Sequence, residues 1–203
     1  MKKLLKYTSL YNLFNLIIGA SKARRILLND YIKSNDNARI LDLGCGTCSI
    51  LPNLDFMEYT GIDISDEYIE SNKRRFSKYS DVLFIASDIN DFLENNDSQY
   101  DIVLLLGVMH HLNDEDLGLL LRNIRKAISP DGRLVTFDGC IEEQTPRFTR
   151  WILNNDRGNY VRTKAAWLDV FLSSDAFSDY TYSIRRDLLC IPYNHIIFHR
   201  REK

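Results

Sequence analysis

Two glycines and two carboxylates stand where short apolar runs of the sequence end. Gly44 and Gly46 follow the run ARILDL, Asp63 lies near the end of the next run, nineteen residues after Gly44, and Asp88 follows a third run. Glycines let a backbone approach a ligand closely, and the start of the following helix offers unpaired amides. A carboxylate at the end of the second run can accept both hydroxyls of a ribose. The pattern predicts a site for a ribose-containing ligand.

Two adjacent histidines mark the end of a fourth run, LLLGVMHHL, which brings Gly107, His110 and His111 toward the same edge. A histidine near a reacting centre can accept the proton of an alcohol nucleophile, so His110 or His111 is a candidate base. Neighbours in a turn point in different directions, so only one can easily face a pocket. The alternative is a pair that only anchors a turn, and Asp63 or Asp88 could likewise only cap a helix. No third ligand completes a metal-binding spacing, so no metal is expected.

The four cysteines, Cys45, Cys48, Cys140 and Cys190, are too few and too scattered for a disulfide framework. Cys45 and Cys48 form a CxxC motif, which a zinc site or a redox pair also uses. No second CxxC or histidine pair accompanies it. We therefore expect both cysteines to be small residues in a tight turn.

The pattern of apolar residues predicts the strands that position the glycines, carboxylates and histidines. Five β-rich runs are expected to be strands, and most of them are almost continuously apolar, as strands buried on both faces of a parallel sheet are. They cover 38–44, 58–64, 81–87, 100–106 and 132–138.

Amphipathic segments alternate with these strands, as in a doubly wound α/β sheet, in which ligands bind outside the carboxyl ends of the strands. Helices are expected from about Cys48, over 66–79, near Asp91, over 114–128 and over 165–171, and SPDG at 129–132 is expected to be a turn. Two further β-like runs, 179–186 and 194–200, are close enough to form an antiparallel hairpin at one sheet edge.

Composition limits the class of protein. The chain has 203 residues, 45% of them hydrophobic, and a net charge of −2. These values exclude a disordered chain and argue against a general nucleic-acid binder. No apolar run is long enough to span a membrane, so stable membrane insertion is not expected.

The N-terminus superficially imitates a secretory signal, because Lys2, Lys3 and Lys6 precede an apolar stretch. Apolar residues from Leu10 to Ile18 recur at helical spacing, which favours an amphipathic helix and a cytoplasmic protein. The chain is expected to be a single domain over 1–203, with 1–33 as a helical cover and 140–164 as a substrate-side insertion.

Five segments resemble the successive motifs of class I S-adenosylmethionine-dependent methyltransferases: RILDLGCGT, EYTGIDIS, FIASDIND, YDIVLLLGVMHHL and SPDGRLVTFD. The resemblance covers about Arg39 to Asp138. It implies a Rossmann-like seven-stranded sheet in the order 3-2-1-4-5-7-6, with an antiparallel last strand and helices on both faces. The run 194–200 suits the place of that last strand.

The resemblance also implies roles for residues that bind S-adenosylmethionine. Asp42 would lie near the ammonium group and Asp63 would hold the ribose hydroxyls. Asp88 would accept from the adenine amino group. The other implied cofactor-binding residues are Gly44, Cys45, Gly46, Ile64, Ile89, Gly107 and Val108. Cys48 stands where the family often has a third glycine, so that one contact departs from the family.

Three other functions stay open. An NAD-dependent dehydrogenase shares the architecture, but its GxGxxG fingerprint would need glycine at Ser49. A binding protein without activity would more plausibly have lost Asp63 or the glycines. A protein methyltransferase would need a docking groove, and none is evident.

The acceptor should be selected by the segment 147–164, which has a local charge of +4. Arginines there would suit a phosphate or carboxylate, and aromatic rings could stack on a flat or sugar-like group. The candidate substrate-binding residues are Arg147, Arg150, Trp151, Arg157 and Tyr160. The expected acceptor is a small molecule: an anionic metabolite, a sugar, or a glycolipid or natural-product intermediate. The oligomeric state stays open.

Overall fold

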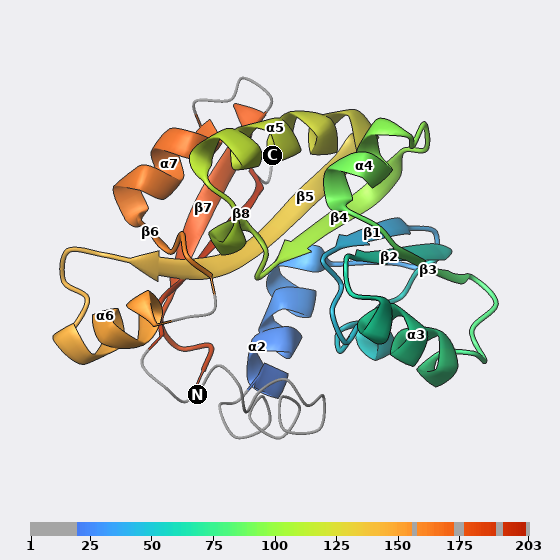
Figure 1. Cartoon of the computed structure of the whole chain (residues 1–203), viewed down its shortest axis with the longest axis horizontal. Coiled ribbons are helices and arrows are strands. Elements are labelled where there is room, and N and C mark those ends of the chain that lie inside the picture. Colours follow the sequence, from blue (N-terminus) through green and yellow to red (C-terminus); the bar gives the residue numbers. More distant parts are fainter. Residues whose placement is uncertain (1–19, 156–157, 173–176, 190–192, 202–203) are drawn as a thin grey trace.

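A central sheet of eight strands organises the computed structural model, which describes residues 20–155, 158–172, 177–189 and 193–201. Seven strands follow one another in the order β3-β2-β1-β4-β5-β8-β7, and β6 pairs with β5 off this path (Figure 1). The strands are β1 (Arg39–Leu43), β2 (Glu58–Asp63), β3 (Val82–Ala86), β4 (Tyr100–Leu106), β5 (Ile128–Ile141), β6 (Arg162–Thr163), β7 (Tyr180–Arg185) and β8 (His195–Arg200).

The predicted topology is confirmed. The first five strands run parallel, β8 pairs antiparallel with β5 at Asp138 and Gly139, and β7 pairs antiparallel with β8. The predicted hairpin at the sheet edge is therefore β7–β8. The short strand β6 was not predicted. The last two strands are therefore numbered β7 and β8 here, where the expected seven-stranded order has 6 and 7.

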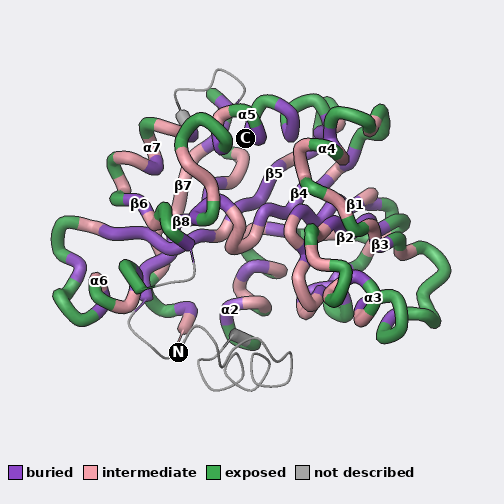
Figure 2. Tube along the Cα trace, viewed as in Figure 1, coloured by how far each residue is buried: buried purple, intermediate pink, exposed green. Residues whose placement is uncertain are grey.

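Helices cover both faces of this sheet. One face carries α2 (Ala20–Ile26), the π-helical turn η2 (Leu27–Ile32) and α3 (Asp66–Arg75), which bury Leu27, Ile32 and Ile69. The other carries α4 (Ile89–Glu94), α5 (Asp114–Ala127) and α7 (Lys164–Leu172), which bury Leu93, Leu121 and Trp167 (Figure 1). The central strands β1, β2 and β4 are mostly buried (Figure 2), as their apolar runs predicted. At the edge of the sheet, β3 buries only Phe84, and Leu83 is 54% exposed. Three further elements are η3 (Leu51–Asn53), η4 (Met109–His111) and α6 (Arg147–Asn154).

Three side chains at strand ends start helices by capping them. Ser65 accepts from the amide of Tyr68, Asp88 from that of Asn90, and Asn113 from that of Asp116. These contacts satisfy amides that the first helical turn leaves unpaired. The helix predicted over 66–79 ends at Arg75 instead.

The expected turn at 129–132 is part of β5. The pairing with β4 shifts register between Tyr100 and Ile102, so the segment forms a bulge inside a strand of 14 residues. Gly132 is needed there, because a Cβ would lie 2.7 Å from the carbonyl oxygen of Tyr100. The turn prediction was wrong because the turn-forming residues are absorbed as a strand irregularity.

The N-terminal cover can be followed only from residue 20. Ala23, Leu27 and Ile32 are buried against the sheet. Residues 1–19, which include the lysines and Leu10 to Ile18, lie outside the described residues. Among the described helices, none has the length and apolar character that a membrane crossing requires.

Candidate active site

The loop after β1 takes a backbone shape that few side chains tolerate. Gly44 has φ of 72°, Gly46 of 50° and Cys48 of 48°, all in the left-handed region. Cys48 is the position where the resembling family often has glycine. Because cysteine carries a Cβ, holding this conformation costs on the order of 1–2 kcal/mol. The surrounding contacts compensate for that strain.

Gly44 packs against the next strand end along the sheet. A Cβ on Gly44 would lie 2.4 Å from Cγ2 of Val108, which follows β4. A Cβ on Gly46 would meet nothing within 4 Å. A side chain would therefore be blocked at Gly44, whereas there is open space for one at Gly46.

Asp63 ends β2 and is half-buried beside this loop. Its Oδ2 accepts from the amide of Gly46 at 2.8 Å, and its Oδ1 accepts from the amide of Ser65 at 2.9 Å. Each carboxylate oxygen can accept a second hydrogen bond. Asp63 thus holds the glycine loop and keeps capacity for two hydroxyls. Ile64 beside it is 76% exposed, which leaves an apolar side chain at the rim.

Asp88 lies at the end of β3 and is exposed. One of its oxygens, Oδ1, accepts from the amides of Asn90 and Asp91 at 2.8 and 3.4 Å. The helix-capping alternative is thus realised, and Oδ2 takes no part in it. Ile89 packs against the main core cluster at the start of α4.

A buried polar chain lies beneath the loop. The hydroxyl of Tyr59 donates to Oδ2 of Asp42 at 2.6 Å, and Sγ of Cys48 lies 3.3 Å from the same hydroxyl. Burial raises the pKa of the Asp42 carboxyl to about 6, although the hydrogen bond from Tyr59 acts in the opposite direction. Asp42 is 3% exposed, so the carboxylate shapes the loop from below.

The CxxC motif is part of this turn, as expected. The amide of Cys48 donates to the carbonyl of Cys45 at 2.8 Å, and both thiols are free and buried. The pKa of the Cys45 thiol is raised by its contact with Cys48 and by burial. A thiol held protonated in this way is a poor nucleophile and a poor metal ligand.

The two histidines have different surroundings. His110 is buried, and its Nδ1 lies 2.6 Å from Oδ1 of Asp138, which also accepts from the amide of His110 at 3.1 Å. His111 is exposed, with its ring 4.3 Å from that of His110. Burial raises the pKa of the Asp138 carboxyl, and the contact with His110 opposes that rise. Asp138 therefore orients the ring of His110, as a carboxylate partner of a histidine does.

A segment from the insertion covers His110. A Cβ on Gly158 would lie 1.9 Å from Cδ2 of His110, and the amide of Tyr160 donates to the carbonyl of His110 at 2.9 Å. Because only glycine fits at 158, the segment 158–160 lies directly on the histidine. The insertion therefore borders the candidate base, on the side of β4 and β5.

The basic residues of the insertion do not share one function. Nη2 of Arg150 donates to the carbonyl of Glu142 at 3.1 Å, Lys164 lies 5.3 Å from the Tyr182 ring, and Arg162 is buried. Arg147 is exposed, and Arg157 lies outside the described residues. The local charge of +4 is therefore not gathered into one anion site.

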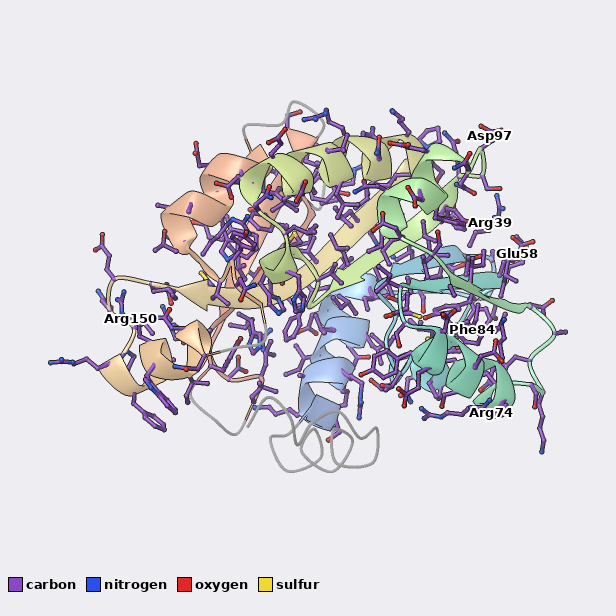
Figure 3. All side chains as sticks on the ribbon, in the orientation of Figure 1. Arg39, Glu58, Arg74, Phe84, Asp97 and Arg150 are labelled. Carbon is purple, nitrogen blue, oxygen red and sulfur yellow. The ribbon has the colours of Figure 1, made fainter. Side chains whose placement is uncertain are left out.

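The aromatic residues of the insertion are the more accessible ones. Trp151 is 58% exposed and stacks on Phe148, with ring centroids 6.3 Å apart, and Tyr160 is 42% exposed. Figure 3 places Arg150, on the same helix α6, at the end of the molecule opposite Arg39, Glu58 and Phe84. The insertion thus borders the β5 side of the site and not the β2–β3 side.

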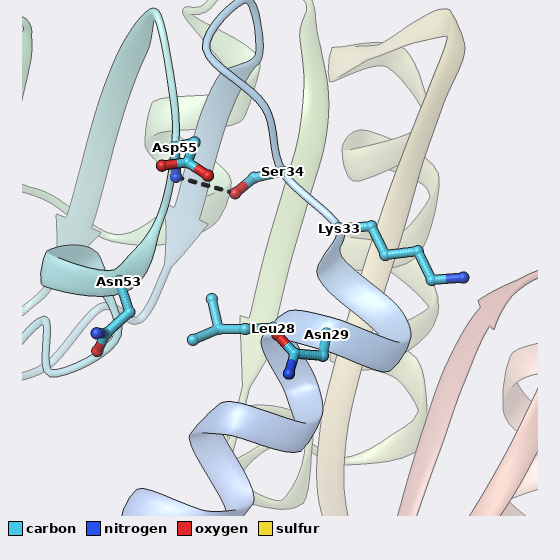
Figure 4. A pocket seen from close by; sticks show the side chains of 6 residues that line it. All are labelled: Leu28, Asn29, Lys33, Ser34, Asn53 and Asp55. Carbon is cyan, nitrogen blue, oxygen red and sulfur yellow. Dashed lines mark hydrogen bonds between the residues drawn. The ribbon is translucent and has the colours of Figure 1, made fainter.

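A surface hollow lies elsewhere. It has a volume of about 370 Å³ and is lined by Leu28, Asn29, Lys33, Ser34, Asn53 and Asp55 (Figure 4). Its residues precede β1 and β2, so it lies at the amino ends of these strands. The glycine loop, Asp63 and His110 all lie at the carboxyl ends.

Sequence reasoning missed three residues of this region: Asp138, Gly158 and Arg162. Asp138 follows the apolar part of the fifth strand, so the rule that located Asp63 and Asp88 would also have found it. Arg162 was counted only as one of the surface charges. Nothing in the sequence pattern marks Gly158 as a residue in contact with His110.

The strand order, the reversed strand β8 and the glycine loop after β1 define a Rossmann-like methyltransferase fold. Residues 41–134 match a family model described as a methyltransferase domain. The matched domain and the fold are those of class I S-adenosylmethionine-dependent methyltransferases, as the sequence motifs predicted.

Solved structures agree on the fold. The N-methyltransferase NodS from Bradyrhizobium japonicum WM9 has a TM-score of 0.67 at 17% identity, over 91% of this chain and 97% of that one. The complex of DhpI with SAH has a TM-score of 0.64 at 22% identity, over 89% of this chain and 83% of that one. A glycine loop with open space at Gly46 and a carboxylate, Asp63, that accepts from the Gly46 amide has the donors and acceptors that the cofactor of this class needs.

Relatives by sequence are far longer proteins. Lovastatin diketide synthase lovF from Aspergillus terreus is 32% identical over 131 residues, and probable polyketide synthase 13 from Dictyostelium discoideum is 34% identical over 119 residues. The matches cover 59% and 48% of this chain and 5% of each relative. The chain thus corresponds to a small part of these polyketide synthases.

Proposed function

We propose that this chain transfers the methyl group of S-adenosylmethionine to a small natural-product intermediate, with His110 as the proton acceptor. One observation carries the proposal. The glycine loop with Asp63 and the His110–Asp138 pair lie at the carboxyl ends of adjoining strands β1, β2, β4 and β5. Ligands of open parallel sheets bind at that edge.

Binding of the cofactor would fall to residues of the first three strands. Asp63 would accept the ribose hydroxyls, Asp88 would accept from the adenine amino group through Oδ2, and Ile89 would pack on the ring. Asp42 supports the loop through Tyr59 and Cys48. Gly107 and Val108 would border the reacting centre.

The chemistry supplied by the bound cofactor is a methyl group on a sulfonium, displaced in line with a neutral thioether as leaving group. Catalysis by this chain would then consist of holding the acceptor in line and removing its proton. Asp138 fixes the ring of His110 through a contact of 2.6 Å, which leaves Nε2 as the atom to take that proton. The covering segment 158–160 would exclude water from His110.

Support for a natural-product acceptor comes from the polyketide synthase relatives and from the exposed aromatic rings of the insertion. A requirement for an anionic acceptor has less support, because Arg150, Arg162 and Lys164 have partners within the protein. Trp151 and Tyr160 are suited to a flat or sugar-like group.

Cofactor binding is tested by calorimetry with S-adenosylmethionine, its homocysteine product and NAD. We expect the first two to bind and Asp63→Ala to weaken their binding by about 1.5–3 kcal/mol, the scale of hydrogen bonds to a charged group. Asp88→Ala should cost less, since ring packing on Ile89 remains. Binding of NAD alone, or unchanged affinity in a folded Asp63→Ala protein, would overturn the cofactor orientation.

Acceptor selection is tested with Trp151→Ala once a screen of natural-product intermediates has found an acceptor. We expect the KM of the acceptor to rise about fivefold to tenfold, as when one stacking contact is lost, with unchanged affinity for the homocysteine product. Tyr79→Ala is the matched control, because Tyr79 is also an exposed aromatic, 45% accessible, but follows α3. Equal effects of the two substitutions would remove the insertion from acceptor binding.

A further inference from the structure

Arg162 is a buried charge at the start of β6, only 7% exposed. Its Nε donates to Oδ1 of Asp114 at 2.8 Å, and Nη2 lies 2.7 Å from the same oxygen. Asp114 is the first residue of α5, and its side chain is 74% exposed. An ion pair with so exposed a partner contributes little, so it does not explain why the arginine is buried.

The hydrogen bonds from Arg162 to backbone carbonyls explain why this arginine is buried. Nη1 donates to the carbonyls of Met109 at 3.3 Å and Tyr160 at 3.1 Å, and Nη2 donates to the carbonyl of Leu112 at 2.7 Å. Met109 and Leu112 flank the histidine pair. The carbonyl of His110, between them, accepts from the amide of Tyr160. The segment 160–162 thus holds three carbonyls of the loop that carries His110.

Trp167 connects the Arg162 guanidinium to the strand end that carries Asp138, the partner of His110. The guanidinium lies 4.7 Å from the centre of the Trp167 ring, and Nε1 of that ring donates to the carbonyl of Gly139 at 2.9 Å. Gly139 follows Asp138 directly. Arg162 and Trp167 together therefore contact both strand ends that supply the His110–Asp138 pair.

We infer that Arg162 is a positioning residue that sets the geometry of the His110–Asp138 pair by clamping the β4–α5 loop to β6. The role rests on the proposed function, in which His110 accepts the proton. The planar guanidinium of arginine has five N–H donors, so it can donate to carbonyls in several directions at once. A lysine ammonium presents its donors on one atom and cannot span the same acceptors.

The test compares Arg162→Lys and Arg162→Gln with Asp114→Asn. The lysine variant keeps a positive charge beside Asp114 but loses the carbonyl fork, whereas Asp114→Asn removes the ion pair and keeps the fork. We expect both Arg162 variants to lose, by solvent exchange, the NMR signal of the proton between His110 and Asp138. Hydrogen exchange at the Tyr160 amide should become about tenfold faster. Asp114→Asn should retain the signal and the protection.

Neither readout needs a methyl acceptor, so this inference and the proposed function fail separately. Failure of the wild-type protein to bind S-adenosylmethionine would defeat the function and leave the clamp measurable. Retention of the His110–Asp138 proton in folded Arg162→Lys would overturn the clamp. So would equal effects of Asp114→Asn, since the ion pair alone would then account for them. If Arg162→Gln does not fold, Arg162→Lys carries the test.

Once a methyl acceptor is known, the proposed role of Arg162 also predicts an effect on kcat. Arg162→Lys should lower kcat while the affinity for the homocysteine product stays the same, because only the loop on the β4–β5 side is released. A parallel loss of cofactor affinity and thermal stability would indicate a general structural role and would contradict the proposal.

Discussion

Replacement of His110 by glutamine is expected to lower kcat by about 10²–10⁴-fold, the range of a lost general base. Glutamine keeps a polar side chain of similar length beside Asp138, so the strand ends should stay in place, but its amide cannot accept a proton. The measurement is transfer of a labelled methyl group to the acceptor at saturating concentrations of both substrates. Affinity for the homocysteine product should not change.

His111→Gln is the matched control for this prediction. The two histidines are adjacent, but His110 is buried with its Nδ1 2.6 Å from Oδ1 of Asp138, whereas His111 is exposed. We expect His111→Gln to retain kcat within about twofold, since surface substitutions usually have small effects. A folded His110→Gln protein with wild-type kcat would eliminate the base. The acceptor would then need to be a nucleophile that reacts without losing a proton to the enzyme.

Replacement of Gly44 by alanine is expected to weaken binding of S-adenosylmethionine by about tenfold to a hundredfold. Two costs add. The left-handed backbone at φ of 72° costs roughly 1–2 kcal/mol for any residue with a Cβ, and the new Cβ would lie 2.4 Å from Cγ2 of Val108. Because Val108 would border the reacting centre in the proposed function, relief of that overlap would move the loop or Val108 within the proposed site. Calorimetry with the homocysteine product measures the loss.

Gly46→Ala separates the two costs. Gly46 has the same left-handed conformation, but a Cβ there meets nothing within 4 Å, so only the backbone cost applies in the free protein. Adding Val108→Ala to Gly44→Ala removes Cγ2 and should restore part of the affinity, a coupling that a double-mutant cycle detects. If Gly44→Ala binds as tightly as the wild type, or Val108→Ala gives no rescue, the packing of the loop against β4 does not control the site.

Local sequence was sufficient to predict the order of the seven main strands and the places of Asp63 and Asp88 at strand ends. Strands such as β1 and β4 are almost continuously apolar because they are buried in the middle of a parallel sheet, so each run is visible without knowledge of its partners. Asp63 and Asp88 follow such runs directly, which puts them at the carboxyl edge whatever the details of packing. The left-handed positions at Gly44 and Gly46 are likewise properties of single residues.

Tertiary structure was needed wherever a residue's role depends on a distant partner. Asp138 meets His110 across 28 positions of sequence because β4 and β5 pair with Leu106 opposite Phe137, a register set after the bulge at 129–132. Arg162 reads as a surface charge in the sequence, whereas packing against Trp167 and the β4–α5 loop buries it. Composition and periodicity report which face of its own element a side chain occupies. They do not report which atoms of another element it meets, and those contacts place His110, Asp138 and Arg162 relative to one another.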